Sequence, residues 1–273
     1  MNVPAELAID PERAINHGVE WVKEYFARAR INTAVIGISG GSDSALTAYI
    51  CCKAIGHENV KGLIMPLGDS MSASDMCDAE ELCETLEMGN RKIDIEKIFD
   101  EIAKTNSSKN QDRIAMANVK ARIRMLLLYK EANERKAIVA GTDDRSEHEL
   151  GYYTKYGDGG VDINVPEYLY KTQVRSVLYH LGSKENMKIF TRIAEKVPSP
   201  QLWKGHTAEG ELGMSYEDID RIFYYKNEGG FGDKIESIAK ATGIKPSEVR
   251  RIIDFSHSNA HKNVLPPAPS ILI

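Results

Sequence analysis

Short apolar runs alternate with stretches of helical periodicity along the first half of the chain. The predicted strands are Thr33–Ile38, Val60–Met65, Asn90–Ile95 and Ala137–Ala140, of which the first and last are apolar runs suited to a strand buried on both faces. Helical spacing of apolar residues marks Pro11–Arg30, Ser42–Ile55, Ser72–Glu87 and Asp112–Asn133, and the polar stretch Lys104–Asp112 is expected to form a loop. Strands that alternate with helices predict an α/β fold, with a Rossmann-like, doubly wound parallel sheet that has helices on both faces.

The pattern changes after Leu150. Tyrosines and glycines become frequent, and Gly157–Gly160 is incompatible with a helix. Short helices are expected at Lys171–Leu181, Asn186–Glu195, Ser215–Tyr225, Gly232–Thr242 and Pro246–Asn259, with a mobile loop at Val197–Gly213. We therefore expect a single domain over residues 1–273, with an N-terminal helix at 10–30, an α/β core at about 31–182, and a helical C-terminal half with a tail at about 183–273.

The composition argues against several classes of function. The chain of 273 residues has a net charge of −5 at pH 7, so it lacks the basic surface typical of nucleic-acid-binding proteins. It contains no apolar run of about 18 residues that would span a membrane, and its N-terminal residues do not resemble a secretory signal. The four cysteines form no C-x-x-C pair. We expect a cytoplasmic protein that binds neither nucleic acid nor membranes.

The most informative stretch is Ser39-Gly40-Gly41-Ser42-Asp43-Ser44, which lies between a predicted buried strand and a predicted helix. Ligands of parallel sheets bind at the carboxyl ends of the strands. Glycines let the backbone approach a ligand closely, and the N-terminus of a helix attracts anions. The alternative is an ordinary glycine turn in which a serine or aspartate caps the helix. The string matches neither the Walker pattern nor the G-x-G-x-x-G pattern of dinucleotide-binding proteins.

This string resembles the pyrophosphate loop of the ATP pyrophosphatases, which cleave ATP between its α and β phosphates and include NAD⁺, GMP, asparagine and argininosuccinate synthetases. The resemblance implies an adenine nucleotide α-hydrolase-like fold. It also implies that the loop cradles the β,γ-pyrophosphate of ATP and that Asp43 reaches a Mg²⁺ ion, which prefers carboxylate and phosphate oxygens. The ATP-binding residues that it implies are Gly37, Ile38, Ser39, Gly40, Gly41, Ser42, Asp43 and Ser44.

Four further stretches narrow the resemblance. They are Gly141–Glu147, Tyr152–Asp162, Leu169–Val174 and His261–Pro269. Each has an ordinary interpretation when taken alone: Glu147 as a solvated helix residue, Lys171 as a surface charge, His261 as a capping residue. In this order and after the glycine-rich loop, they resemble the NAD⁺ synthetase family along nearly the whole chain, from Gly37 to Pro269.

The NAD⁺ synthetase resemblance assigns roles to individual residues. Asp43 and Glu147 match the metal ligands, and both are expected to act in catalysis together with Lys171. Thr142, Lys171 and Ser199 match further ATP contacts, with serine at the last position where threonine is usual. Contacts with deamido-NAD⁺ are implied for Arg122, Lys155, Asp162, His261 and Lys262. The chain departs from the family pattern at Asp144, His206, Gly210 and Asn263, and these departures bear on substrate affinity and loop closure.

The implied reaction is the last step of NAD⁺ biosynthesis. ATP adenylates the carboxylate of deamido-NAD⁺ (nicotinic acid adenine dinucleotide), diphosphate leaves, and ammonia displaces AMP to give the amide. Mg²⁺ is the implied cofactor, ATP a co-substrate and a homodimer the implied assembly. Ammonia is the expected nitrogen donor because the chain has no room for a separate amidase domain. The alternative source of ammonia is a separately encoded glutaminase subunit. Alternatives are another adenylating, amide-forming ligase of the group and a non-catalytic nucleotide sensor.

Overall fold

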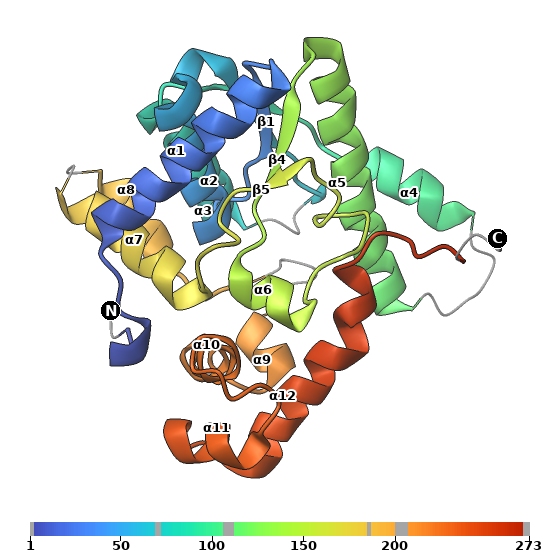
Figure 1. The fold of residues 1–273 in the computed structure, drawn as a ribbon. Coiled ribbons are helices and arrows are strands. Elements are labelled where there is room, and N and C mark those ends of the chain that lie inside the picture. The colour runs from blue at the N-terminus through green and yellow to red at the C-terminus, as the bar shows by residue number, and fades with distance from the viewer. Residues whose placement is uncertain (1–2, 69–71, 106–111, 185–186, 200–206, 270–273) are drawn as a thin grey trace.

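A five-stranded parallel sheet lies at the centre of the protein (Figure 1). The computed structural model describes residues 3–68, 72–105, 112–184, 187–199 and 207–269. The strands are β1 (Ala34–Gly37), β2 (Val60–Ile64), β3 (Gly89–Lys92), β4 (Ile138–Gly141) and β5 (Ile163–Asn164), in the order β3-β2-β1-β4-β5. The chain moves outward from β1 to β3 and then continues on the other side of β1, so the strand order reverses between β1 and β4.

The middle strand explains why the sheet was recognisable in the sequence. β1 pairs with β2 on one side and with β4 on the other. Successive side chains of a strand point to opposite faces, and here Ile36 packs into the core on one face while Val35 packs into the core on the other. Both side chains are fully buried. A strand covered on both faces needs a continuous apolar run, which is the pattern found at Thr33–Ile38.

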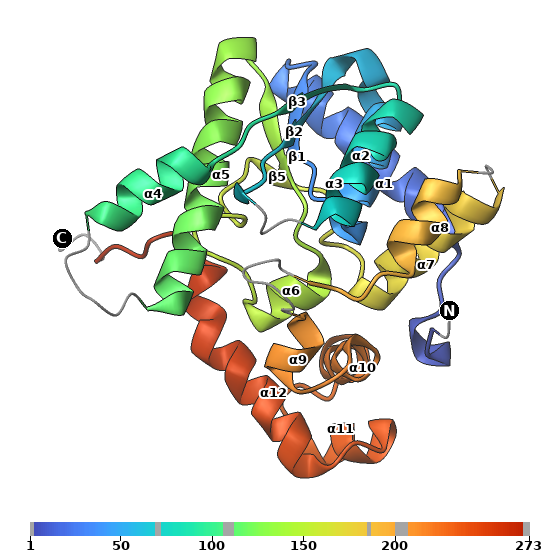
Figure 2. The same cartoon turned by 180° about the vertical axis from the view of Figure 1, so that it is seen from behind.

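Helices cover both faces of the sheet (Figures 1 and 2). One face carries α1 (Pro11–Ala29), α2 (Ser42–Ile55), α3 (Ala73–Thr85), α7 (Lys171–Lys184) and α8 (Lys188–Ala194). The other face carries α4 (Glu96–Lys104) and α5 (Arg113–Arg135). The start of α1 shows how local chemistry sets a helix boundary, because the Asp10 carboxylate accepts hydrogen bonds from the backbone N–H groups of Glu12 and Arg13.

A second apolar core holds the C-terminal helices together below the carboxyl edge of the sheet (Figure 1). The helices are α9 (Ala208–Leu212), α10 (Tyr216–Asn227), α11 (Ile235–Thr242) and α12 (Pro246–Asn259). Leu150, at the end of α6 (Arg145–Leu150), and Tyr170, just before α7, belong to this core as well. The short helix at Ala5–Leu7 contributes Leu7. The second core therefore fixes the C-terminal helices against elements that leave the sheet.

The structure confirms the α/β class with its parallel sheet, and the unpredicted α-helices and strands among the described residues are α4, α6, α9 and β5. The third strand was expected to reach Ile95 but ends at Lys92, and α4 begins at Glu96. The helix expected from Gly232 begins at Ile235, since Gly232 adopts a left-handed conformation with φ of 55°. No helix within the described ranges is long and apolar enough to cross a membrane.

The expected loop at Val197–Gly213 is partly wrong, since α9 occupies Ala208–Leu212. Thr207 caps this helix by accepting a hydrogen bond from the Gly210 N–H at 3.1 Å. Ala208 and Leu212, one helical turn apart, are buried in the second core. Residues 200–206 of that loop, which include His206, lie outside the described residues, as do residues 106–111 of the loop expected at Lys104–Asp112.

Candidate active site

Two loops meet where the strand order reverses. The segment after β1 leads into α2, and the segment after the neighbouring strand β4 leads into α6. Because both strands run in the same direction, both segments leave the sheet at its carboxyl edge (Figure 1). In open α/β sheets this is the usual location of a ligand site. The stretches predicted from the sequence to bind ATP and metal therefore come together at one place.

Serine hydroxyls shape the loop after β1. The Ser44 hydroxyl donates a hydrogen bond to the Gly41 carbonyl oxygen at 3.1 Å and accepts one from the Ser39 N–H at 3.3 Å. The Ser39 hydroxyl accepts from the Gly41 N–H at 3.3 Å. No side chain caps the N-terminus of α2, which begins at Ser42. Uncapped N–H groups at a helix N-terminus bind anions, so this loop is suited to a phosphate group.

Gly40 sits in the tightest part of this loop. Its φ is 73°, and a Cβ atom at this position would lie 2.3 Å from the carbonyl oxygen of Asp75 in α3. Lys196, which follows α8, donates hydrogen bonds to the Gly40 carbonyl oxygen at 3.1 Å and to the Asp75 carboxylate at 2.6 Å. The loop is thus held from outside by α3 and by Lys196, and only glycine fits at its corner.

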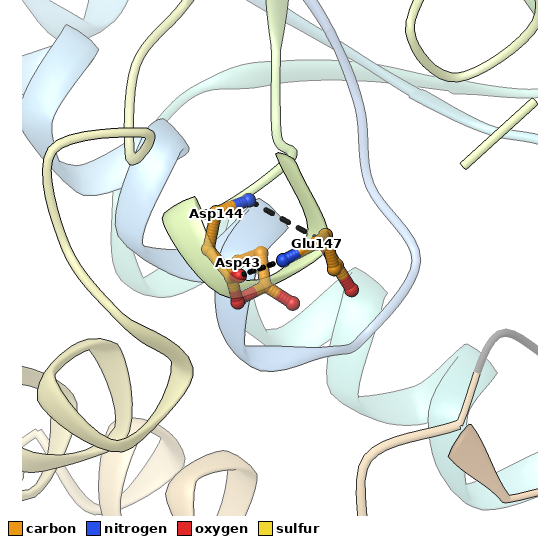
Figure 3. Close-up of side chains that lie close together, drawn as sticks. All are labelled: Asp43, Asp144 and Glu147. Carbon is orange, nitrogen blue, oxygen red and sulfur yellow. Dashed lines mark hydrogen bonds between the residues drawn. The ribbon is translucent and has the colours of Figure 1, made fainter. Parts of the chain in front are cut away.

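Three carboxylates surround one ammonium group beside this loop. Figure 3 shows the side chains of Asp43, Asp144 and Glu147 lying close together. The Lys171 Nζ atom lies 2.9 Å from Asp43 Oδ2, 2.7 Å from Asp144 Oδ2 and 2.9 Å from Glu147 Oε1. The Ser42 hydroxyl also donates to Asp43 Oδ2, at 3.2 Å. The three residues predicted to act in catalysis are therefore in contact, and Asp144 joins them.

A capping box places two of the carboxylates. Asp144 is the N-cap of α6, and its Oδ1 atom accepts from the Glu147 N–H at 2.9 Å. In return, Glu147 Oε2 accepts from the Asp144 N–H at 3.3 Å. This reciprocal pair is the usual signature of a helix start. Here it leaves one oxygen of each residue, Asp144 Oδ2 and Glu147 Oε1, to face Lys171.

The first residue of α7 is fixed by polar groups from α6 and α10. The Ser146 hydroxyl accepts a hydrogen bond from the Lys171 N–H at 2.8 Å and donates one to Asp220 at 2.5 Å. Asp220, which is fully buried in α10, also accepts from the Thr172 N–H at 2.9 Å. The Lys171 ammonium lies 5.3 Å from the centre of the Tyr216 ring. The C-terminal helices thus help to place Lys171 at the sheet edge.

Burial and charge shift the pKa values in this cluster. Burial raises the pKa of Glu147 to about 7; Lys171 opposes that rise and Asp43 adds to it. Burial also raises the pKa of Asp144, against the opposing charge of Lys171. For Lys171, burial disfavours the charged form, but Asp144, Asp43 and Glu147 outweigh it, so the pKa of Lys171 is raised. Without a bound cation, the cluster retains a proton more readily than isolated carboxylates would.

The carboxylate cluster fits a hard divalent cation. One oxygen atom from each of Asp43, Asp144 and Glu147 lies within 4.8 Å of the others. The Oδ1 atom of Asp43 is buried and has no hydrogen-bond partner among the described residues. A buried oxygen without a partner is costly unless a ligand satisfies it. All the donors are carboxylate oxygens, the ligand type that Mg²⁺ prefers over nitrogen or sulfur.

Of the other residues predicted to contact ATP, Gly37, Ile38 and Thr142 lie at the same edge of the sheet. Gly37 is the last residue of β1, and the N–H of the buried Ile38 donates to the Leu63 carbonyl oxygen at 2.9 Å, so these two residues extend the sheet up to the loop. Thr142 follows β4 and is half-buried. Ser199 is exposed and lies in the described segment after α8.

Two of the lysines predicted to contact the dinucleotide connect the C-terminal tail to the loop after α6. Lys155 donates to the carbonyl oxygens of His261 at 2.5 Å and Val264 at 3.0 Å. In the opposite direction, Lys262 donates to the carbonyl oxygens of Gly151 at 2.6 Å and Tyr153 at 3.0 Å. Each of the two segments thus contributes one lysine that bonds to the backbone of the other, and together they hold the tail beside α6.

Asn263 strengthens this attachment. Its side-chain N–H donates to the His148 carbonyl oxygen at 2.9 Å, and its Oδ1 atom accepts from the Tyr153 hydroxyl at 2.6 Å. An amide can donate and accept at once, which a guanidinium cannot. The departure from the family pattern at this position therefore has a defined structural role, since it fixes the course of the tail.

Arg122 and Asp162 also form contacts within the fold. Arg122, exposed on α5, donates to the Lys155 carbonyl oxygen at 3.3 Å, so it lies beside the loop that the tail covers. Asp162 accepts from the Val139 N–H at 2.8 Å and from the Tyr129 hydroxyl at 3.1 Å. Both of its oxygens are engaged in joining β4 to α5.

Asp144, Tyr216 and Lys196 are among the site residues that were not predicted. Asp144 was noted only as a departure, although the D-x-x-E spacing with Glu147 is the signature of a capping box. Tyr216 is fully buried beside Lys171, and its hydroxyl has no hydrogen-bond partner in the described part of the chain. Lys196 supports the loop at Gly40. No local pattern marks the last two, because their contacts join segments far apart in the chain.

An anion-binding loop and an acidic cluster at the reversal point of a parallel sheet define an α/β protein of the nucleotide-binding type. Comparison with known families makes this assignment specific. The sequence model described as NAD synthase matches residues 14–266. The chain therefore belongs to the NAD synthase family, and the resemblance seen in its sequence motifs is confirmed.

Relatives and solved structures agree with this family. The chain is 41% identical to the NH(3)-dependent NAD(+) synthetase of Hyperthermus butylicus over 96% of this chain and 92% of that protein. The structure of the NMN synthetase from Francisella tularensis is similar with a TM-score of 0.82 and 30% identity, over 97% of this chain and 100% of that one. An NH3-dependent NAD synthetase from Campylobacter jejuni, solved with a nitrate ion, gives a TM-score of 0.77 at 27% identity, over 96% and 100% of the two chains.

Proposed function

We propose that this protein converts deamido-NAD⁺ to NAD⁺ with ATP and free ammonia, through an acyl adenylate, and releases AMP and diphosphate. The observation that carries the proposal is the contact of Lys171 with Asp43 and Glu147 beside the loop at Ser39–Ser44. The name of the Hyperthermus butylicus relative, which is matched along nearly its whole length, supports both the reaction and the nitrogen donor.

The proposed chemistry requires positioning and charge stabilisation rather than a protein nucleophile. Ammonia does not displace oxide from a carboxylate, but it displaces AMP from a mixed anhydride. In the adenylation step, a carboxylate oxygen of deamido-NAD⁺ attacks the α-phosphorus of ATP, and the bond to the β-phosphate oxygen breaks. The backbone N–H groups at the start of α2 and the Lys171 ammonium then stabilise the negative charge that develops on the departing diphosphate.

Asp43 and Glu147 are the residues that would hold Mg²⁺. Each side chain is about one-fifth exposed, at 19% and 20%, so each has a face open to solvent and substrate. A divalent cation held by these two residues would neutralise negative charge on the phosphates during the adenylation. Ser39 and Ser44 keep the loop in the shape that presents its N–H groups, and Lys196 fixes the Gly40 carbonyl oxygen by donating a hydrogen bond to it.

For the dinucleotide, we propose that the tail and the loop after α6 act together. The reciprocal bonds of Lys155 and Lys262 place His261 and the loop next to Arg122 of α5. This arrangement gathers three cationic side chains at one edge of the site, and such side chains suit a ligand that carries phosphates. Asp162 would contribute indirectly, because both of its oxygens already join β4 to α5.

We also propose a homodimer. Several apolar side chains of α4 and α5 are exposed: Ile98 is 38% exposed, Ile102 40%, Ile114 63% and Leu126 63%. Apolar side chains gathered on neighbouring helices are typical of association surfaces. Burying them against a second copy of the chain would place α5, and with it Arg122, next to the partner.

The likeness to the Francisella tularensis NMN synthetase favours a mononucleotide product as the second candidate function. Both candidate reactions begin with adenylation of the nicotinate carboxylate. They differ only in the substrate, which is a mononucleotide in one case and, in the other, the same mononucleotide joined to AMP. The Lys155, Lys262 and Arg122 cluster beside the tail offers more cationic groups than one phosphate needs, which favours the dinucleotide.

Product analysis tests these proposals. The protein is incubated with ATP, Mg²⁺ and either deamido-NAD⁺ or nicotinic acid mononucleotide, with ammonium or glutamine as the nitrogen source. We expect NAD⁺ and AMP in equal amounts from the dinucleotide with ammonium, and neither product with glutamine. A higher kcat/KM for the mononucleotide would establish the second candidate. Release of ADP instead of AMP would exclude both.

A further inference from the structure

Asp144 differs from the other two carboxylates around Lys171 in its access to solvent. Its side chain is 0% exposed, whereas those of Asp43 and Glu147 are 19% and 20% exposed. Lys171 itself is only 2% exposed. Asp43 and Glu147 can therefore reach a ligand from outside, while Asp144 contacts Lys171 from the protein interior.

The two oxygens of Asp144 have separate partners. Oδ1 caps α6 through the Glu147 N–H at 2.9 Å. Oδ2 forms no hydrogen bond of good geometry and faces the Lys171 Nζ atom at 2.7 Å, the shortest of the three contacts of that ammonium. An asparagine at this position would reproduce the cap through its amide oxygen but would present an N–H donor to the ammonium. The capping role and the ion-pair role of Asp144 can thus be separated by one substitution.

The charges around Lys171 change when a cation binds. When all three carboxylates around Lys171 are ionised, two negative charges are uncompensated, which a divalent cation would balance. A cation held by Asp43 and Glu147 takes up the same two carboxylates that hold Lys171, and it repels the ammonium. Asp144 is the remaining partner, and its fully buried carboxylate stays in contact with the ammonium at 2.7 Å.

We propose that Asp144 is a positioning residue that keeps the Lys171 ammonium in the site while Asp43 and Glu147 bind the metal ion. This inference rests on the proposed function for the metal and for Lys171, but not on the identity of the acceptor carboxylate. It assigns Asp144 no contact with substrate. Its effect on turnover passes through Lys171.

The test is a double-mutant cycle with Asp144→Asn, Lys171→Met and the double variant. A matched control is Asp10→Asn, which alters another aspartate N-cap, at the start of α1. Two quantities are measured for each full-length protein: kcat and KM for ATP at saturating Mg²⁺, and the midpoint of thermal unfolding without ligands. The second quantity does not depend on activity.

Asp144→Asn should lower kcat/KM for ATP about 10- to 100-fold, the range found for residues that orient groups around a metal. Its unfolding midpoint should stay close to that of the unmodified protein, because Asp43 and Glu147 still neutralise Lys171. In the Lys171→Met background, Asp144→Asn should lower kcat/KM for ATP by less than about twofold. There it should raise the unfolding midpoint, because it removes a buried carboxylate that has lost its cation. Asp10→Asn should leave both quantities unchanged.

Equal losses of kcat/KM in both backgrounds would overturn the proposal, because they would show that Asp144 acts through the cap of α6 and not through Lys171. An unchanged kcat/KM for Asp144→Asn alone would overturn it as well. Failure of the proposed function has a different signature: the unmodified protein would form no AMP. In that case the unfolding midpoints alone would still show whether Asp144 and Lys171 are coupled.

Discussion

Gly40→Ala is the substitution whose effect the structure specifies most closely. Two separate penalties apply. An alanine at φ of 73° costs about 1–2 kcal/mol, because its Cβ atom is too close to the backbone in the left-handed region. The Cβ atom would also lie 2.3 Å from the Asp75 carbonyl oxygen, which belongs to a helix backbone and cannot rotate away. Relieving such overpacking costs about a further 1–3 kcal/mol.

Gly243→Ala is the matched control. Gly243 has nearly the same φ, 75°, but a Cβ atom there has no atom within 4 Å. Only the conformational penalty of about 1–2 kcal/mol applies. A chain of 273 residues unfolds with an entropy of roughly 0.6 kcal/mol per degree. The control should therefore lose about 2–3 °C in its unfolding midpoint, and Gly40→Ala about 3–9 °C.

The activity of the two variants should differ more than their stability. The clash at Gly40 displaces the loop by a substantial fraction of an ångström, and a misplacement of about 1 Å costs on the order of 100-fold in rate. AMP formation from ATP, Mg²⁺ and deamido-NAD⁺ measures this loss, which Gly243→Ala should not show. Equal unfolding midpoints and equal activities for the two variants would refute the claim that α3 packs against the loop at Gly40.

Three further predictions follow from the site. Asp43→Asn should reduce turnover by at least about 100-fold with no loss of thermal stability, since it removes a metal-binding oxygen and one uncompensated negative charge. Because burial raises the pKa of Glu147 to about 7, Mg²⁺ affinity should increase as pH rises through about 7 and binding should release a proton, which calorimetry in buffers of different ionisation enthalpy detects. Lys262→Met should raise the KM for deamido-NAD⁺ with little change in kcat, because the tail loses its bonds to Gly151 and Tyr153.

Each of these predictions has a result that contradicts it. Asp43→Asn with near-normal turnover would remove Asp43 from the metal site. Mg²⁺ binding without proton release near neutral pH would show that Glu147 is not a ligand, and Glu147→Gln is the control that should abolish the proton release. For the tail, an unchanged KM for Lys262→Met would mean that the bound dinucleotide does not depend on where the tail lies.

The raised pKa of Glu147 also affects stability without metal. A carboxyl group whose pKa is higher in the folded state than in the unfolded state stabilises the fold only while it is protonated. Its contribution is therefore present at low pH and is lost as pH rises from about 4.5 to about 7. The metal-free protein should lose stability across that range, and Mg²⁺ should restore it at the upper end.

The sheet could be predicted from the sequence because its chemistry is local. β1, β2 and β4 are short apolar runs, and the glycine-rich string after β1 marks the carboxyl edge. α1 was predicted from the helical spacing of its apolar residues, and the structure shows the cap that Asp10 provides at its start. α6 and β5 were missed because elements of six and two residues carry too few positions for a periodic pattern. α4 was missed although Ile98, Phe99 and Ile102 have helical spacing.

The site was predicted in part, and the limit has a physical reason. Asp43, Glu147 and Lys171 were each singled out by resemblance, but their mutual contact depends on the fold. Lys171 lies 128 residues from Asp43 along the chain, and α7 reaches the cluster only because Ser146 and Asp220 hold its first turn. For Lys155 and Lys262, the sequence suggested contacts with substrate. The structure shows a further role that the sequence did not suggest, since both ammonium groups bond to backbone carbonyl oxygens.

In the proposed reaction the acceptor carboxylate becomes an acyl adenylate before ammonia attacks. Oxygen labelling tests this step most directly. Deamido-NAD⁺ carrying ¹⁸O in both carboxylate oxygens is converted with unlabelled ATP, Mg²⁺ and ammonium, and AMP and diphosphate are analysed by mass spectrometry. One ¹⁸O atom is expected in each AMP molecule, one in the amide of NAD⁺, and none in diphosphate. Unlabelled AMP formed together with NAD⁺ would contradict this step, because the carboxylate oxygen would then never have been joined to the α-phosphorus.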